Sequence, residues 1–250
     1  MDRKKMRKIV TVEARMSSSR LPGKIMLPLA GKPSLQQLVD RARRAKKIQD
    51  VVIATTVNPQ DDAVEAWAKK NGVSFFRGSE EDVLLRVLEA ARAFKGDVIV
   101  EMTGDCPLLD PAMIDELVSL WEENDYDYVS NILERTYPRG FDTQVFSRAV
   151  LEKVNELTQD PADRENVSLY IYEHPERFKL GGIKAPKELY GPDIRICVDM
   201  KEDYEVIRRI YEALYPKKPD FNAYDIMKFL KDNPEVAKIN ERIQQKKVRA

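Results

Sequence analysis

The chain has 250 residues, of which 43% are hydrophobic and 34% charged, and this length can bury the core of one large domain or two small ones. Its 42 Lys and Arg residues balance 42 Asp and Glu residues, which excludes a global attraction to nucleic acid or an anionic membrane. No run approaches the roughly 18 apolar residues of a membrane span, and no apolar signal core follows the charged start. Because the sequence contains no linker-like segment, we expect a single domain over residues 1–250. We also expect a cytoplasmic location.

Two cysteines and one histidine restrict the possible chemistry. Cys106 and Cys197 cannot build a disulfide framework, and His174 alone cannot complete a Cys/His zinc cluster. A catalytic Ser-His-Asp or Cys-His group would have to use His174, which directly precedes Pro175 at an expected helix end. Any catalysis must therefore depend on carboxylates, lysine, arginine and a metal ion.

The first half of the sequence alternates between strand and helix patterns. Short apolar runs predict strands, and apolar residues that recur every three or four positions predict helices between them. The expected strands are 9–14, 51–54, 73–76 and 98–100, and the expected helices include 35–42, 64–68, 83–91 and 113–121. This alternation predicts a Rossmann-like, three-layer α/β/α fold around a mostly parallel mixed sheet.

The pattern changes after residue 121. Strand-like segments at 126–130 and 141–146 flank a turn at 136–140, which predicts an inserted hairpin or subdomain, and we assign it residues 131–190. Further helices are expected at 149–157, 162–172, 204–214, 222–230 and 234–244, and further strands near 178–183 and 194–198. Residues 246–249 are expected to form a frayed tail.

A polar loop follows the first expected strand, at the sheet edge where open α/β proteins bind nucleotides. Small residues allow backbone N–H groups to approach phosphates, serine hydroxyls add donors, and two arginines and a lysine add positive charge. The expected nucleotide ligands in this loop are Ala14, Arg15, Ser17, Ser18, Ser19, Arg20 and Lys24. The loop contains neither a Walker motif nor a Gly-x-Gly-x-x-Gly turn, which disfavours P-loop kinases and Rossmann oxidoreductases. The alternative is a solvated basic connection.

Two aspartates follow other strands of the expected sheet. Asp105 comes after the strand 98–100 and should lie beside the polar loop, where it could hold Mg²⁺ together with substrate phosphates. Asp199 ends the alternating segment 194–198, which puts Arg195, Cys197 and Asp199 on one face. Each aspartate also has a structural interpretation, since Asp105 could cap a turn and Asp199 could begin a helix capping box.

The motif Arg15-x-x-Ser18-x-Arg20-Leu-Pro-Gly-Lys24, together with Gly104-Asp105-x-Pro-Leu, resembles the cytidylyltransferases that activate sugar acids. It is most similar to the SpsF family of spore coat polysaccharide biosynthesis, and the resemblance runs from about Lys8 to Leu230. It implies the nucleotide-diphospho-sugar transferase fold and Mg²⁺-dependent transfer of CMP from CTP to a sugar acid or related acceptor, with release of pyrophosphate. It also implies that Asp105 and Asp199 hold the metal, that Lys24, Arg20 and Asp105 are catalytic, and that the protein is a homodimer.

The resemblance and the charge pattern supply further candidates. Arg77 and Gly104 are expected at the nucleotide, although Ser79 and Asp82 near Arg77 also form a capping box. The expected acceptor ligands are Arg139, Gly140, Asp142, Arg164 and Glu165. The last two lie in a run that departs from the family pattern, because Asn166 stands where a histidine is expected. A solvated turn and a helix cap are the alternatives for these two groups.

Other functions are compatible with part of this evidence. A guanylyl- or uridylyltransferase of the same fold usually begins with Gly-x-Gly before Thr-Arg-Leu, a pattern that Glu13-Ala14-Arg15 does not match. A non-catalytic nucleotide-sugar binding module would have the same pocket without turnover. The identity of the acceptor cannot be predicted from the sequence.

Overall fold

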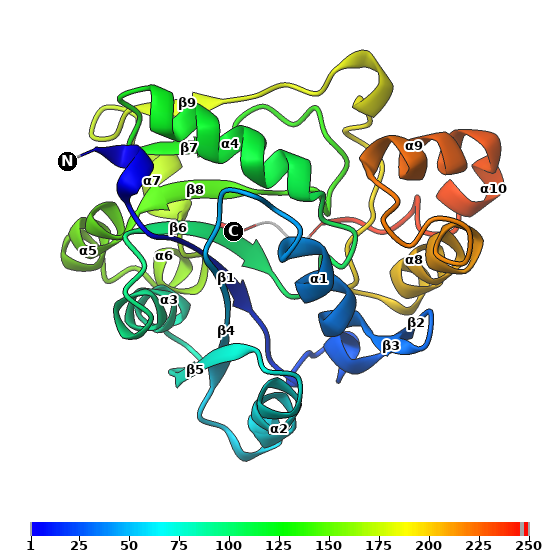
Figure 1. The fold of residues 1–250 in the computed structure, drawn as a ribbon, viewed down its shortest axis with the longest axis horizontal. Coiled ribbons are helices and arrows are strands. Elements are labelled where there is room, and N and C mark those ends of the chain that lie inside the picture. The colour runs from blue at the N-terminus through cyan, green and yellow to red at the C-terminus, as the bar shows by residue number, and fades with distance from the viewer. Residues whose placement is uncertain (1, 246–247, 250) are drawn as a thin grey trace.

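The computed structural model describes residues 2–245 and 248–249. Its centre is a seven-stranded sheet with the order β5-β4-β1-β6-β8-β7-β9 (Figure 1). Neighbouring strands among β5, β4, β1 and β6 pair in parallel, whereas β8 is antiparallel to both β6 and β7. These strands are β1 (Lys8–Glu13), β4 (Asp50–Thr56), β5 (Ser74–Gly78), β6 (Val98–Thr103), β7 (Tyr128–Ser130), β8 (Gln144–Ser147) and β9 (Leu180–Gly182). The predicted mostly parallel mixed sheet is confirmed.

Helices cover both faces of this sheet. Alternate residues of β1 point to opposite faces, so Val10 and Val12 pack with one group of helices and Ile9 packs with the other. The first group is α1 (Ser34–Ala42), α2 (Asp62–Lys70) and α4 (Pro111–Glu123). The second is α3 (Val83–Ala93), α5 (Arg148–Leu157) and α7 (Leu169–Glu173), and α6 (Pro161–Glu165) packs against α3 and α7. The three-layer α/β/α prediction is therefore confirmed.

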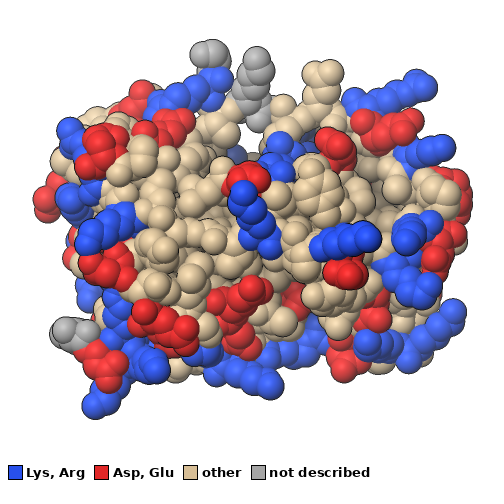
Figure 2. Space-filling view, turned by 90° about the horizontal axis from the view of Figure 1, so that it is seen from above, with Lys and Arg blue, Asp and Glu red and all other residues tan. Residues whose placement is uncertain are grey.

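A third apolar core lies beside the sheet, at the right of Figure 1. It is formed by α8 (Lys201–Leu214), α9 (Ala223–Asp232) and α10 (Pro234–Ala237), with a small hairpin of β2 (Pro28–Leu29) and β3 (Lys32–Pro33) against α8. Charges of both signs are mixed over the face seen in Figure 2, as the balanced composition leads us to expect. No helix among the described residues is long and apolar enough to cross a membrane.

The region from 131 to 190 contributes directly to the main sheet. The strands predicted as an inserted hairpin, β7 and β8, do pair antiparallel, but β8 lies between β6 and β7 in the sheet. Strand β9 then pairs in parallel with β7 and completes that edge. This region therefore does not form a separate hairpin. Around the sheet it adds the connections on either side of β8 and β9.

Two predicted helices are shorter than expected. The helix predicted at 162–172 divides into α6 and α7, because the backbone of Asn166 leaves the helical region and its side-chain amide donates to the Ala162 carbonyl at 2.8 Å. The helix predicted at 234–244 ends at Ala237. Beyond that end, the side chain of Asn240 donates to the Arg195 carbonyl at 3.0 Å and to Asp203 at 2.8 Å, which fixes an irregular path.

Two further predictions need correction. The segment 194–198 is not a strand among the described residues, since it forms only one isolated bridge, between Arg139 and Arg195. Its side chains still alternate, with Ile196 and Val198 buried in the third core. In the predicted frayed tail, residues 246 and 247 lie outside the described residues, whereas Arg249 pairs with three acidic side chains of the α6 and α7 region.

Candidate active site

A cavity of about 360 Å³ opens at the carboxyl ends of β1 and β6. The polar loop after β1 supplies six of its lining residues, Arg15, Ser17, Ser18, Ser19, Arg20 and Lys24. Of the other predicted site residues it also includes Gly104, Asp105, Asp199 and Glu165. The structure therefore brings the loop and the two aspartates together, as the sheet topology predicted.

Local contacts fix the path of the loop. The backbone N–H of Met16 donates to the Asp61 carboxylate at 2.6 Å, and the N–H of Gly23 donates back to the Met16 carbonyl at 3.0 Å. Gly23 has a φ of +70°, a left-handed conformation that glycine adopts without strain. The next residue is Lys24, which begins a short 3-10 helix and whose side chain lines the cavity.

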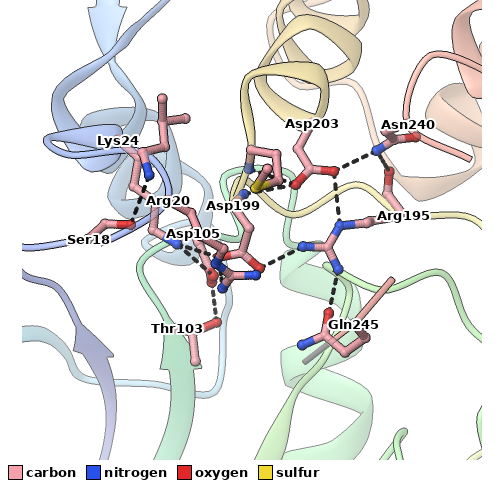
Figure 3. A network of polar contacts seen from close by, with 12 residues as sticks. Ser18, Arg20, Lys24, Thr103, Asp105, Arg195, Asp199, Asp203, Asn240 and Gln245 are labelled. Atoms are coloured by element: carbon pink, nitrogen blue, oxygen red, sulfur yellow. Dashed lines mark hydrogen bonds and ion pairs between the residues drawn. The ribbon is translucent and has the colours of Figure 1, made fainter. Parts of the chain in front are cut away.

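Lys24 joins the two aspartates. Its Nζ lies 3.1 Å from Oδ2 of Asp105 and 2.8 Å from Oδ1 of Asp199 (Figure 3). Arg20 adds a second cation at 2.8 Å from the same Asp199 oxygen. Burial alone would lower the pKa of Lys24, but the two carboxylates outweigh it and raise that pKa, so the lysine is charged.

A buried network holds Asp199 from the other side. Arg195 donates through Nη2 to Asp199 at 2.6 Å and through Nε to Asp203 at 2.9 Å, and all three side chains are at most 6% exposed (Figure 3). Burial opposes ionisation of Asp199, but Lys24, Arg20 and Arg195 together lower its pKa. Asp203 also accepts the N–H groups of Asp199 and Met200 at 3.0 and 2.9 Å, so this carboxylate, not Glu202, caps α8.

Gly104 and the two cysteines lie close to these charges. A Cβ on Gly104 would come within 2.8 Å of the Glu13 carbonyl, so only glycine lets the end of β6 approach β1 this closely. Cys106 and Cys197 are free and buried, and burial raises the pKa of both thiols. They are therefore neutral neighbours of the site and unsuited to act as nucleophiles.

Part of the positive charge of the loop is already compensated. Arg15 pairs with Glu80 at 3.1 Å, and the Ser17 hydroxyl donates to the same carboxylate at 2.6 Å. The hydrogen bond from Ser17 is the main cause of the lowered pKa of Glu80. Sequence analysis did not identify Glu80, which comes from the connection between β5 and α3.

Several predicted site residues lie outside the cavity lining in the part of the chain that the structure describes. Arg77 forms ion pairs with two residues of α2, Asp62 at 2.7 Å and Glu65 at 2.6 Å. Arg164 donates through Nε to Asp82 at 2.9 Å. Ala14 is buried behind the loop, next to Gly104.

Three of the predicted acceptor residues, Arg139, Gly140 and Asp142, also lie outside that lining, whereas Glu165 lines the cavity. Asp142 pairs with Arg135, and Arg139 takes part in the isolated bridge to Arg195. Gly140 has a φ of +112°, and a Cβ there would come within 2.5 Å of the Ile196 carbonyl. This glycine therefore has a sufficient structural role in the close packing of the two segments.

Sequence analysis missed two charged residues that line the cavity, Glu13 and Arg86. Burial, followed by repulsion from Glu101, raises the pKa of Glu13 well above its ordinary value. Burial also lowers the pKa of Arg86, which is only 2% exposed. The signal that could have identified this group is Glu101, a charged residue in the middle of the apolar run Val98–Thr103.

The carboxylates of Asp105 and Asp199 suit the expected metal ion. Asp105 and Asp199 come from separate segments and place two oxygens around one cationic atom, which is the donor set that Mg²⁺ takes together with phosphate oxygens. No three acidic, cysteine or histidine side chains within residues 2–245 and 248–249 form a complete metal cage. The residues therefore fit a metal that is shared with a bound phosphate group.

A cation-rich loop beside two carboxylates, at the carboxyl edge of a mostly parallel sheet, defines an α/β protein built to bind a phosphorylated nucleotide. The family model for cytidylyltransferases matches residues 9–243. The chain belongs to the cytidylyltransferase family.

Individual relatives support this assignment. The chain is 35% identical to the spore coat polysaccharide biosynthesis protein SpsF of Bacillus subtilis, over 90% of this chain and 95% of that protein. It is 28% identical to an 8-amino-3,8-dideoxy-manno-octulosonate cytidylyltransferase of Shewanella halifaxensis, over 92% of this chain and 95% of that one. The structure of a cytidylyltransferase from Leptospira borgpetersenii is similar with a TM-score of 0.88 and 34% identity, covering 97% of this chain and all of that one.

Proposed function

We propose that the protein transfers CMP from CTP to an acidic sugar or a related acceptor and releases pyrophosphate. The observation that carries this proposal is the convergence of Lys24 with Asp105 and Asp199 beside the loop of arginines and serines. This arrangement can bind a triphosphate and neutralise charge as pyrophosphate leaves. The family membership of the chain supports the choice of cytidine as the nucleoside.

The reaction needs little covalent chemistry from the protein. An acceptor oxygen attacks the α-phosphorus of CTP and forms a new P–O bond, while the bond to the β-phosphate oxygen breaks and the acceptor proton passes to water. Arg15, Arg20 and Lys24 would hold the triphosphate in line with the acceptor and compensate the charge of the departing pyrophosphate. Rate enhancement then comes from orientation and electrostatics.

Mg²⁺ is part of this proposal, with Asp105 and Asp199 as the protein ligands. The ion would supply Lewis-acid stabilisation of charge on the phosphate oxygens. Lys24 lies between the same two carboxylates. A triphosphate would give Lys24 a second set of anionic partners while Arg195 keeps Asp199 in place.

The acceptor is the least constrained part of the proposal. The names of related cytidylyltransferases specify octulosonates, which are sugar acids. Glu165 and Asn166, at the break between α6 and α7, line the cavity and are the described candidates for contacting the acceptor. We also propose that the connections within residues 131–190 take part in acceptor binding and in a homodimer. A cytoplasmic location is likewise a prediction.

The direct test has two parts. Calorimetric titration of CTP, UTP, GTP and ATP with Mg²⁺ should give at least tenfold tighter binding of CTP, a difference of ~1.4 kcal/mol. Pyrophosphate release should then be screened with a panel of sugar acids. Tighter binding of another nucleotide would contradict the choice of cytidine, and CTP binding without turnover on any acceptor would favour a binding module.

Replacing Asp105 by asparagine provides the sharpest variant. Asp105→Asn keeps the shape of the side chain but removes one of the two carboxylates around Lys24, and we expect turnover to fall by at least ~10²-fold. The matched control is Asp40→Asn, because Asp40 pairs with Lys32 at 2.8 Å on the exposed side of α1. Turnover of Asp105→Asn within threefold of the wild type would overturn the assigned role.

A further inference from the structure

The end of the chain borders the active-site cavity. Gln245 and Val248 line this cavity, as do the loop after β1 and the two aspartates Asp105 and Asp199. Both residues follow α10, which belongs to the third core beside the sheet. The last described residues therefore leave that core and return to the edge of the sheet that carries the cavity.

Buried hydrogen bonds fix the first part of this segment. Asn240 is 3% exposed and donates to the Arg195 carbonyl at 3.0 Å and to Asp203 at 2.8 Å. Further along the chain, Gln245 accepts a hydrogen bond from the Arg195 guanidinium, which also holds Asp199 (Figure 3). The segment is thus anchored to the arginine that positions one of the proposed metal ligands.

Ion pairs fix the last part of the segment to α6 and α7. Arg249 pairs with Asp160 at 3.1 Å, with Glu173 at 2.7 Å and with Asp163. Asp160 is the N-cap of α6, and the same helix contains Glu165, another residue of the cavity lining. The two anchors therefore lie on different elements that border the cavity, and the lining residues of the segment lie between them in the sequence.

The second anchor is the easier one to release. The side chains of Arg249, Asp160 and Glu173 are 39%, 50% and 35% exposed, so water and salt weaken these ion pairs. Asp163 is buried, but it also accepts a hydrogen bond from the Thr158 hydroxyl at 2.6 Å and keeps that partner when Arg249 moves away. The buried hydrogen bonds of Asn240 do not depend on Arg249.

We propose that residues 240–245 and 248–249 form a strap that controls exchange of the ligand in the cavity. The strap covers the cavity while Arg249 is paired and opens when these ion pairs break, and the bonds to Asn240 keep its other side in place. The inference rests on the proposed function, since the ligand is taken to be a nucleoside triphosphate with Mg²⁺. A closed strap slows both entry and departure of this ligand and keeps water from the reacting groups.

Releasing the ion-pair anchor should speed exchange in both directions. In Arg249→Ala we expect the association and dissociation rate constants of CTP with Mg²⁺ each to rise at least fivefold, while Kd changes by less than threefold. The measurement is stopped-flow fluorescence with CTP that carries a fluorescent label on its ribose. The matched control is Arg209→Ala, which removes an exposed ion pair to Glu205 and should leave both rate constants within twofold of the wild type.

A second variant tests the same anchor from the opposite partner. Glu173→Gln removes one of the three carboxylates and leaves the strap itself intact, so both rate constants should rise at least twofold but less than in Arg249→Ala. Rate constants of Arg249→Ala within twofold of the wild type would overturn the strap, and so would a rise in only one of them, because a contact with the ligand alone would change dissociation without changing association. An unchanged Glu173→Gln would also contradict the proposal. Absence of CTP binding to the wild type would instead overturn the proposed function, and this inference with it.

Discussion

Two charged clusters at the cavity are stabilised in opposite ways. In the ionic cluster of Lys24, Asp105, Asp199 and Arg195, each charged group pairs with a partner at 2.6 to 3.1 Å. In the acidic pair of Glu13 and Glu101, of which only Glu13 lines the cavity, burial raises the pKa of both carboxyl groups. Ion pairs between charged groups therefore hold the first cluster, whereas burial favours the neutral form of the second.

Removing Arg195 should break the ionic cluster with the largest effect. Arg195→Ala leaves Asp199 and Asp203 as buried carboxylates without their guanidinium partner, and the loss of one member of such a network costs about 3–5 kcal/mol. The measurement is urea unfolding at pH 7. Arg209→Ala, which removes an exposed ion pair to Glu205, should cost about 1 kcal/mol or less and serves as the control. A loss below about 1 kcal/mol in Arg195→Ala would mean that the cluster is not prearranged.

The acidic pair should make the free energy of unfolding depend on pH. Burial raises the pKa of Glu101 to about 7, so between its ordinary value near 4.5 and 7 the folded protein keeps a proton that the unfolded chain releases. Stability should therefore fall as the pH rises through this window, by up to about 3 kcal/mol for a shift of this size. Glu101→Gln should be less sensitive to pH and more stable than the wild type at pH 8. Parallel denaturation profiles of the two proteins from pH 5 to 8 would contradict this interpretation.

The same contrast explains what the sequence could predict. Arg20, Lys24 and Asp105 lie in short contiguous motifs at strand ends, and the sheet topology alone brings those ends together. Glu13 and Arg86 are separated by more than one strand and helix, and their meeting depends on strand register and on which side of α3 faces the sheet. Neither the strand register nor the orientation of α3 can be predicted from a local sequence pattern.

Other misses have local causes of the same kind. A periodic apolar pattern predicted one helix at 162–172, but the Asn166 side chain competes for the Ala162 carbonyl and ends α6. Arg77 was predicted at the nucleotide from the resemblance to the family, but in the structure its guanidinium pairs with Asp62 and Glu65 of α2, outside the cavity lining. The sequence indicated the position of Arg77 at the end of a strand but not the direction of its side chain.

Replacing Arg77 should have the smallest effect of the changes considered, and it discriminates residues that bind the nucleotide from residues that pair elsewhere. Because its charge is satisfied by Asp62 and Glu65 on a partly exposed surface, Arg77→Ala should change CTP affinity by less than twofold and stability by about 1 kcal/mol or less. Lys24→Ala, which removes a cation from the ionic cluster, should weaken CTP binding at least tenfold in the same titration. If both variants lost affinity equally, the motif near Arg77 would belong to the nucleotide pocket after all, and binding would have to pull Arg77 away from α2. An unchanged affinity in Arg77→Ala would restrict the predicted nucleotide contacts to the loop after β1 and the two aspartates.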